Sequence, residues 1–283
     1  MNLSLGFSPC PNDTFIFDAM INNKIDTEGL SFEVTIADVE ELNRRAFRCS
    51  LDITKLSYYA YAHLTKDYIL LHAGSALGNN CGPLLISKPA YQRINVADIT
   101  IAIPGTYTTA NFLLSLAYPD ATRKVEMRFS DIENAILQNK AKAGVIIHEN
   151  RFTYQAKGLV KILDLGEYWE TQTGLPVPLG GIVVKRKVPL DIAQKVNRIL
   201  RKSVEYAFAH QASSSKYVRQ HAQEMDESVR KQHIQLYVNN FTADLEETGK
   251  RAIMTLFSRA YKNKLIPNMP ENIFLQESEE IKT

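Results

Sequence analysis

The first 150 residues of the chain alternate short β-rich runs with stretches in which apolar residues recur at helical spacing. This alternation is typical of βαβ units, which build a largely parallel sheet with helices packed on it. The sequence therefore predicts an α/β fold. Strands are expected at 3–8, 31–36, 51–56, 69–73, 84–87, 99–103, 126–129, 143–147 and 182–184. Helices are expected at 13–22, 39–48, 57–64, 108–117 and 131–139, each beginning at or near a Ser, Thr or Asp that can cap free N–H groups.

The pattern changes after Pro189, where only helical periodicity remains. Helices are expected at 191–210 and over the charged stretch 213–257. Because these helices follow the last strand, we expect them to pack back on a lobe that the earlier strands have built. The acidic tail after Pro270 is expected to be peripheral.

Two segments of the sequence are alike. Asp38 begins a helical pattern that leads into a strand ending at Ser57, and Asp131 begins another that leads into a strand ending at His148. Either one strand-helix-strand design is used twice, or two βαβ units are alike by chance. Ligands of open α/β sheets bind outside the carboxyl ends of the strands, so Ser57 and His148 would approach a shared cleft from opposite walls.

We therefore expect two lobes around a central cleft, joined by two hinge crossings near 84–89 and 177–187. Each crossing pairs Gly or Pro with a β-rich run, so limited hinge closure is a reasonable hypothesis. One lobe would comprise residues 1–87 and 186–283, and the other residues 88–185.

Charge and composition exclude several classes of function. The formal net charge is only +2, and there is neither a dense Lys/Arg stripe nor a zinc-finger pattern, so we expect no nucleic-acid partner. No positive segment precedes an apolar stretch at the start, so a secretory signal is not expected. No apolar run approaches the roughly 20 residues that cross a bilayer. Three widely spaced cysteines fit reduced thiols, and we expect a soluble, cytoplasmic protein with no membrane partner.

The segment 8–14 (SPCPNDT) predicts a stiff turn between a strand and a helix. Two prolines fix its backbone, and Asn12 or Asp13 can cap the helix, whose free N–H groups favour an anion. A plain capped turn is the alternative interpretation. Cys10 is a weak candidate for a nucleophile, because no base is adjacent to it in the sequence.

The segment 105–109 (GTYTT) joins another strand to a helix. Glycine lets a ligand approach the backbone, and the hydroxyls of Thr108 and Thr109 with the helix N-terminal amides can bind a carboxylate or hydroxyl. Thr108 as an ordinary N-cap is the alternative, and it is compatible with ligand contact. The lysine of a nucleoside-triphosphate loop is absent.

His148 ends an apolar run and is followed by Glu149 and Arg151. An imidazole with an ordinary pKa near ~6.5 can act as a general base at neutral pH, and a strand end is where a cleft would lie. A structural role is the alternative for any single histidine. The remaining histidines lack the spacing of zinc ligands, so no metal is expected.

Four motifs in this order resemble the 1,4-dihydroxy-6-naphthoate synthases of the futalosine route to menaquinone. They are SPCPNDTF at 8–15, PGTYTTA at 104–110, IIHENR at 146–151 and GLPVPLGG at 174–181. The resemblance covers the first two-thirds of the chain, and the first and last motifs are the more specific ones. It implies a periplasmic-binding-protein-like (type II) fold with a central cleft and two hinge crossings.

The resemblance also implies an activity. Members of the family are carbon-carbon lyases that convert cyclic dehypoxanthine futalosine to 1,4-dihydroxy-6-naphthoate by general-base-initiated cleavage, without a metal or organic cofactor. His148 would be the base. The loop 78–83 (GNNCGP) departs from the aromatic-containing versions typical of the family. The family's substrate contacts would fall on Asn12, Asp13, Thr14, Ser57, Thr108, Thr109, Gly78 and Asn79.

Two alternatives stay open. One is the chorismate dehydratase of the same pathway, which also needs a carboxylate-binding cleft; the SPCPNDTF and IIHENR motifs favour the synthase. The other is a non-catalytic small-carboxylate-binding protein, which would bind without turnover and against which the missing secretory signal counts. In each case the partner is a small molecule, and a homodimer is left open.

Overall fold

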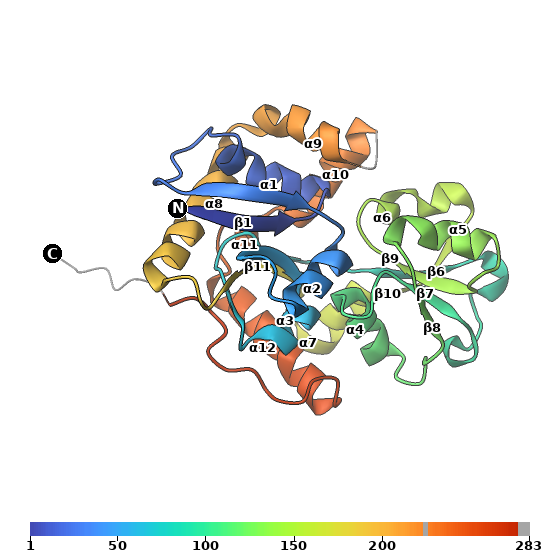
Figure 1. Cartoon of the computed structure of the whole chain (residues 1–283). Helices are drawn as coiled ribbons and strands as arrows, with labels where there is room; N and C mark the ends of the chain where they lie inside the picture. Colours follow the sequence, from blue (N-terminus) through green and yellow to red (C-terminus); the bar gives the residue numbers. More distant parts are fainter. Residues whose placement is uncertain (223–225, 277–283) are drawn as a thin grey trace.

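The computed structural model describes residues 1–222 and 226–276, and its strands form two sheets (Figure 1). The first sheet contains β1 (Asn2–Phe7), β2 (Ser31–Ile36), β3 (Ile53–Ser57), β4 (Tyr68–Leu70), β5 (Ala76–Gly78) and β11 (Val177–Lys185). The second contains β6 (Leu84–Ser87), β7 (Ile101–Ile103), β8 (Lys124–Glu126), β9 (Ala143–Ile146) and β10 (Val160–Asp164). The first sheet has the order β2-β1-β3-β11-β4, with β5 paired to β11, and the second has the order β10-β6-β9-β7-β8.

Both sheets mix parallel and antiparallel pairing. β1 pairs in parallel with β2 and β3, while β11 runs antiparallel to β3 and β4. In the second sheet β7 pairs in parallel with β8 and β9, and β6 is antiparallel to β9 and β10. Parallel strands bring their carboxyl ends to one edge, which is where α/β sheets bind ligands. Residues that follow β1, β3, β7 and β9 are therefore the ones from which a site can be built.

Helices cover both sheets, and two of them touch strands of each. The helices that pack around the first sheet are α1 (Pro11–Ile21), α2 (Val39–Phe47), α3 (Tyr58–Leu64), α8 (Leu190–Ala209), α9 (Ser215–His221), α10 (Glu227–Tyr237), α11 (Asn240–Ala243) and α12 (Glu246–Lys262). The others are α4 (Thr109–Ala117), α5 (Ile132–Leu137), α6 (Asn150–Thr153) and α7 (Leu165–Thr173). α5 packs on β7 and β9, whereas α4 and α7 contact strands of both sheets. α8 and α10 pack on α1, and α12 packs on β11, as expected for C-terminal helices that fold back on an existing lobe.

The chain passes between the sheets twice, through residues 79–83 and 165–176. β6 therefore lies in the second sheet and β11 in the first, so the changes of sheet do not fall at the expected limits of 87/88 and 185/186. The division into lobes 1–87 with 186–283 and 88–185 stays a prediction. The two crossing segments touch backbone to backbone, because a Cβ at Gly82 would lie 2.2 Å from Cα of Gly166. Only glycine permits such an approach.

Most of the expected strands and α-helices are present, with four additions. β5, β10, α6 and α7 were not expected, and the expected strand 126–129 is displaced, because β8 ends at Glu126 and 129–131 form a 3₁₀ helix. The expected helical stretch 213–257 is divided among α9, α10, α11 and α12, and residues 223–225 within it lie outside the described residues.

The tail is less peripheral than expected up to residue 276. The N–H of Leu70 on β4 donates to the carbonyl of Ile273 at 2.8 Å, and the N–H of Leu275 donates to the carbonyl of Leu70 at 2.8 Å. Ile273 and Leu275 are buried. This pairing covers an edge strand that would otherwise present free N–H and C=O groups. Residues 277–283 lie outside the described residues.

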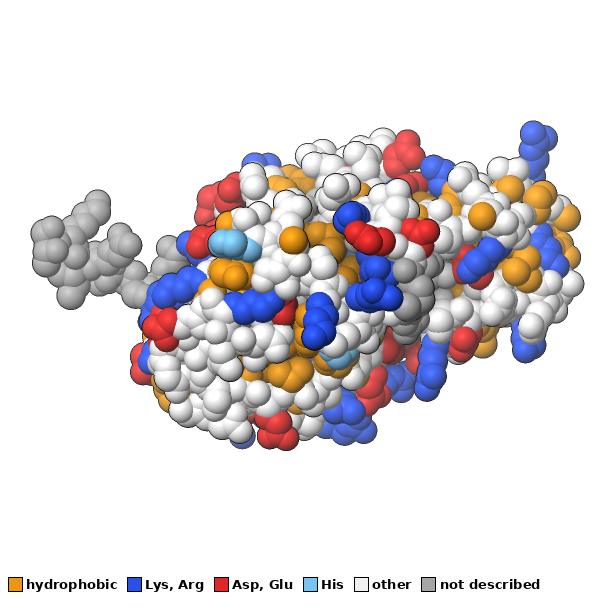
Figure 2. Space-filling model, turned by 90° about the horizontal axis from the view of Figure 1, so that it is seen from above, with side chains coloured by type: hydrophobic (Ala, Val, Ile, Leu, Met, Phe, Trp, Pro, Cys, Tyr) orange, Lys and Arg blue, Asp and Glu red, His pale blue; other side chains and the backbone are white. Residues whose placement is uncertain are grey.

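The face of the molecule shown in Figure 2 has no large patch of one charge, because basic and acidic side chains are interspersed on it. This agrees with the formal net charge of only +2. Among the helices of the described ranges, none combines the length and apolar character needed to cross a bilayer.

Candidate active site

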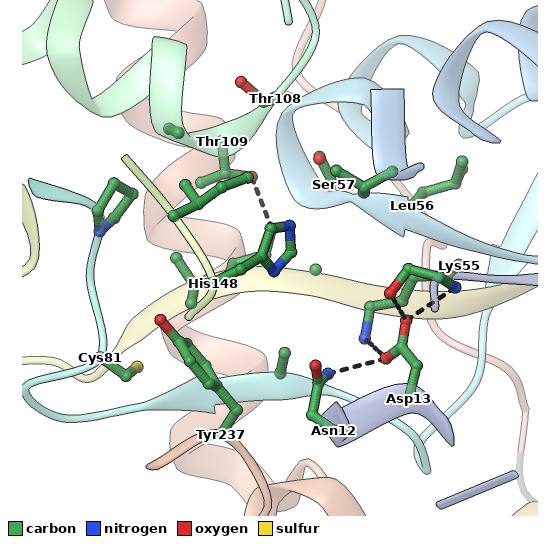
Figure 3. Close-up of a pocket in the computed structure, with 18 of the residues that line it drawn as sticks. Asn12, Asp13, Lys55, Leu56, Ser57, Cys81, Thr108, Thr109, His148 and Tyr237 are labelled. Carbon is green, nitrogen blue, oxygen red and sulfur yellow. Dashed lines mark hydrogen bonds and ion pairs between the residues drawn. The ribbon is translucent and has the colours of Figure 1, made fainter. Parts of the chain in front are cut away.

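A cavity of about 80 Å³ lies between the two sheets (Figure 3). Its walls come from the ends of β1 and β3 on the first sheet and from the residues after β7 and β9 on the second. Ser57 and His148 both line it, from different sheets, as the two alike segments of the sequence predict. Six of the nine residues expected at a site line this cavity: Asn12, Asp13, Ser57, Thr108, Thr109 and His148.

The turn after β1 is organised by the carboxylate of Asp13. Oδ2 accepts hydrogen bonds from the N–H and the hydroxyl of Ser8 at 3.1 and 2.7 Å. Oδ1 accepts from Nδ2 of Asn12 at 2.8 Å and forms an ion pair with Nζ of Lys55 at 3.0 Å. Asp13 and Lys55 are both buried, so each is the counter-charge that the other needs away from water. Asp13 thus holds the turn together, and its oxygens are already engaged.

Ser57 is held by Asn43 on α2. The N–H of Ser57 donates to Oδ1 of Asn43 at 3.0 Å, and Nδ2 of Asn43 donates to the Ser57 hydroxyl oxygen at 3.2 Å. Asn43 Nδ2 also donates to Glu40 at 3.1 Å, and burial raises the pKa of Glu40 to about 7. Because the Ser57 oxygen accepts from Asn43, its own proton is free to be donated to a ligand.

Thr108 and Thr109 stand at the start of α4, and their hydroxyls are engaged. The Thr108 hydroxyl donates to the carbonyl of Gly105 at 2.8 Å and accepts from the N–H of Asn111, so Thr108 is the N-cap of α4. The Thr109 hydroxyl donates to the carbonyl of Leu179 at 2.7 Å. What this turn can offer a ligand is therefore the N–H groups of Thr109 and Ala110, which have no acceptor inside the helix.

His148 follows β9 in a left-handed backbone conformation, with φ of 57°. Such conformations are uncommon for residues other than glycine and gather at functional sites. The edge of its ring meets Phe129, with 4.6 Å between ring centroids, and its Nδ1 lies 3.3 Å from the sulfur of Cys10. Its Nε2 is buried with no hydrogen-bond partner among the described residues. Burial lowers the pKa of His148 to about 4, so the imidazole is neutral at physiological pH.

His233 on α10 also lines the cavity, although the sequence analysis gave it no role. It is fully buried, and its Nε2 lies 2.9 Å from Oδ1 of Asn12. Because Nδ2 of Asn12 is already donating to Asp13, Oδ1 is the acceptor and Nε2 of His233 carries the proton. Burial holds the pKa of His233 well below its usual range. No local signal marks His233, since 221 residues separate it from Asn12.

Cys10 lies against His148, but its thiol is not activated as a nucleophile. Its thiol is buried, and burial, reinforced by Glu149, raises its pKa well above the ordinary value. A nucleophilic cysteine needs the opposite shift, toward the thiolate. Donor atoms of Cys10, His148 and Glu149 nevertheless lie within 4.8 Å of one another, and this is the group in the described ranges whose donors could hold a metal ion.

The other three expected site residues lie away from the cavity. Thr14 is fully buried, and its hydroxyl donates to the carbonyls of Cys10 and Pro11. Gly78 pairs with β11, and Asn79 is exposed in the first crossing segment.

Two mixed sheets joined by two crossings, with a cavity between them, define a two-lobed α/β protein of the binding-protein type. A Candida albicans gene product described as exhibiting the generic periplasmic binding protein structural fold superposes with a TM-score of 0.71 at 11% identity, covering all of both chains. The predicted binding-protein-like α/β fold is thus confirmed.

Comparison of the sequence with known proteins identifies the family within this class of fold. The profile of the menaquinone biosynthesis family matches residues 3–262, and the chain belongs to that family. A 1,4-dihydroxy-6-naphthoate synthase from Thermus thermophilus is 42% identical over 273 residues, which is 96% of this chain and 99% of that protein. The crystal structure of a protein from Archaeoglobus fulgidus has a TM-score of 0.89 at 35% identity, covering 94% of this chain and 98% of that one.

Proposed function

We propose that this protein is a lyase that converts cyclic dehypoxanthine futalosine to 1,4-dihydroxy-6-naphthoate in menaquinone biosynthesis. Membership of the menaquinone biosynthesis family and 42% identity to a synthase of that name support the reaction. The observation that carries the mechanism is a neutral imidazole on the wall of the cavity, with a free nitrogen, with the Ser57 hydroxyl on the facing wall and with N–H groups of α4 on its own side.

His148 is the general base of this proposal. Of its two neutral tautomers, the one with the proton on Nδ1 directs that proton toward the sulfur of Cys10 and leaves a lone pair on Nε2. The other tautomer would bury an N–H without an acceptor, which proteins avoid. Nε2 can then take a proton from a substrate that reaches it, and burial keeps the base unprotonated.

Both walls supply donors for charge that develops on oxygen. The free proton of Ser57 lies on the wall of the first sheet, facing His148, and the first-turn N–H groups of Thr109 and Ala110 lie after β7 on the same side as His148. A proton taken from carbon leaves negative charge on an adjacent oxygen, and fixed donors in a dry site stabilise it strongly. The substrate carboxylate is a second anion that the N-terminus of α4 can bind.

The cavity is too small for this substrate as it stands. Its volume is about 80 Å³, whereas an engineered cavity that binds benzene, a much smaller molecule than the substrate, has about 150 Å³. We therefore include hinge opening in the proposal, with the segments 79–83 and 165–176 as the hinges. Closure would then exclude water from the reaction.

A cytoplasmic location is part of the proposal as well. The three cysteines are free thiols, two of them buried, which fits a reducing compartment. A homodimer is left open.

The test is turnover by the purified protein. Cyclic dehypoxanthine futalosine should give a naphthoate that absorbs in the near ultraviolet, while chorismate should be unchanged. The variant His148→Ala should lose activity by about 100-fold or more, as expected for loss of a general base. The control variant His210→Gln replaces an exposed histidine and should keep full activity. Turnover of chorismate, or binding without turnover, would replace the proposal with one of the two alternatives.

A further inference from the structure

A thiol, an imidazole and a carboxylate meet beside the proposed base. The sulfur of Cys10 lies 3.3 Å from Nδ1 of His148, and one donor atom from each of Cys10, His148 and Glu149 lies within 4.8 Å of the others. Cys10 comes from the turn after β1 and the other two from the end of β9, so the group bridges the two sheets. Cys10 and Glu149 are buried, and His148 is partly buried.

His233 contributes an independent observation. Because its Nε2 donates to Asn12, its Nδ1 carries a lone pair, and this atom is buried with no hydrogen-bond partner among the described residues. Nδ1 lies 4.0 Å from Oε2 of Glu149. A histidine held at one nitrogen by an amide oxygen, with the other nitrogen bare, has the arrangement that metal-binding histidines have.

The donors suit one kind of ion. Zinc binds thiolate sulfur at about 2.3 Å and imidazole nitrogen or carboxylate oxygen at about 2.0–2.2 Å, which places tetrahedral donors about 3.3–3.8 Å apart. The contact between Cys10 and His148 already has this length, and the widest separation of 4.8 Å must close by about 1 Å. Soft sulfur beside imidazole selects zinc-like ions over magnesium or calcium, which take oxygen ligands.

We propose that Cys10, His148 and Glu149 bind a zinc-like divalent ion, and that this ion inhibits the enzyme. An ion on Nδ1 of His148 leaves the ring proton on Nε2, the atom that must be bare to act as a base. The inhibitory half of the inference rests on the proposed function, whereas the binding half does not. His148 therefore cannot bind the ion and act as the general base at the same time.

Binding must also release a proton from Cys10. Burial keeps this thiol protonated, and the thiolate is the metal ligand.

Cobalt(II) is the probe for binding, because a thiolate bound to cobalt absorbs in the near ultraviolet by charge transfer and a tetrahedral site gives intense visible bands. We expect one equivalent of cobalt to produce both bands, and zinc to abolish them by displacement. Cys10→Ser should remove the charge-transfer band, and Glu149→Gln should weaken binding by about 10-fold or more. Cys49→Ala removes an exposed thiol elsewhere and serves as the control, with an unchanged spectrum. Circular dichroism and thermal unfolding confirm that each variant is folded.

Activity is measured on the same samples with added zinc and then with a chelator. We expect zinc to inhibit wild type and Cys49→Ala reversibly, at the concentration at which it displaces cobalt. A cobalt spectrum that is absent in wild type, or that persists in Cys10→Ser and Glu149→Gln, overturns the site. Zinc that displaces cobalt without inhibiting turnover overturns the inhibitory half. Failure to turn over cyclic dehypoxanthine futalosine would refute the proposed function but leave the cobalt result standing.

Discussion

The lowered pKa of His148 determines the lowest pH at which the enzyme should keep its activity. Burial lowers the pKa of His148 from its ordinary 6.5 to about 4. The sign follows from the charge: desolvation penalises the imidazolium, so the neutral base persists to lower pH. At about pH 5.5 a base with a pKa of about 4 is about 97% neutral, whereas one with a pKa of about 6.5 is about 9% neutral. The predicted difference in kcat/KM is therefore about tenfold at this pH.

The assay is kcat/KM for naphthoate formation between about pH 4.5 and pH 8, because this ratio reports ionisations of the free enzyme. We expect a plateau down to about pH 5.5. The substrate carboxyl titrates near pH 4, so the imidazole must be followed separately, by the NMR signal of its ring proton, assigned by its loss in His148→Gln. A midpoint near 6.5 in the folded protein, or an acid limb of kcat/KM there, would refute the argument that burial controls this base.

Three substitutions test other parts of the site and fold. Ser57→Ala removes the free donor on the wall facing the base and should lower kcat by about 100-fold with little change in unfolding by urea. Asp13→Ala leaves the Lys55 ammonium buried without its partner and should cost about 3–5 kcal/mol in the free energy of unfolding, measured by urea denaturation. Gly82→Ala forces a methyl group against the backbone of α7 and should cost about 1–3 kcal/mol or more, measured as a lower Tm. The matched control, Gly249→Ala in α12, meets the flexible side chain of Leu245 at 3.3 Å rather than backbone, so it should lower the Tm much less than Gly82→Ala does.

The sequence was most informative where local patterns decide the structure. The alternation of β-rich runs with apolar helical stretches placed β1 to β3 and α1 to α4, although α1 is buried at every position from Pro11 to Met20 and has no single apolar face. β5 has three residues and pairs with β11, β10 pairs with β6, and α7 packs on strands of both sheets, so all three depend on contacts that only the tertiary fold creates. The chain changes sheet a few residues before each expected crossing, since the sheet in which β6 and β11 pair is a long-range choice.

The site shows the same limit. Strand ends predicted that Ser57 and His148 would face one cavity, and they do line it together. Nothing local predicted His233, because its part in the site depends on α10 packing beside α1. Thr14 follows two cavity residues in sequence, but the helix turns its side chain back to carbonyls at the start of α1. A motif therefore predicts which turn meets the ligand better than it predicts which side chain does.

The direction of the hydrogen bonds at the site gives the two walls opposite roles. On one wall the side chain of Asn43 donates to the Ser57 oxygen, so that the Ser57 proton is left to be donated outward. On the other wall burial keeps His148 neutral, so that its free nitrogen can only accept. The proposed reaction moves a proton from a substrate carbon to His148 and negative charge toward Ser57. An acceptor on one wall and a donor on the other are therefore in place before any substrate enters. Preorganisation of this kind costs no reorientation during the reaction, which is why fixed dipoles can outperform water in stabilising the developing charge.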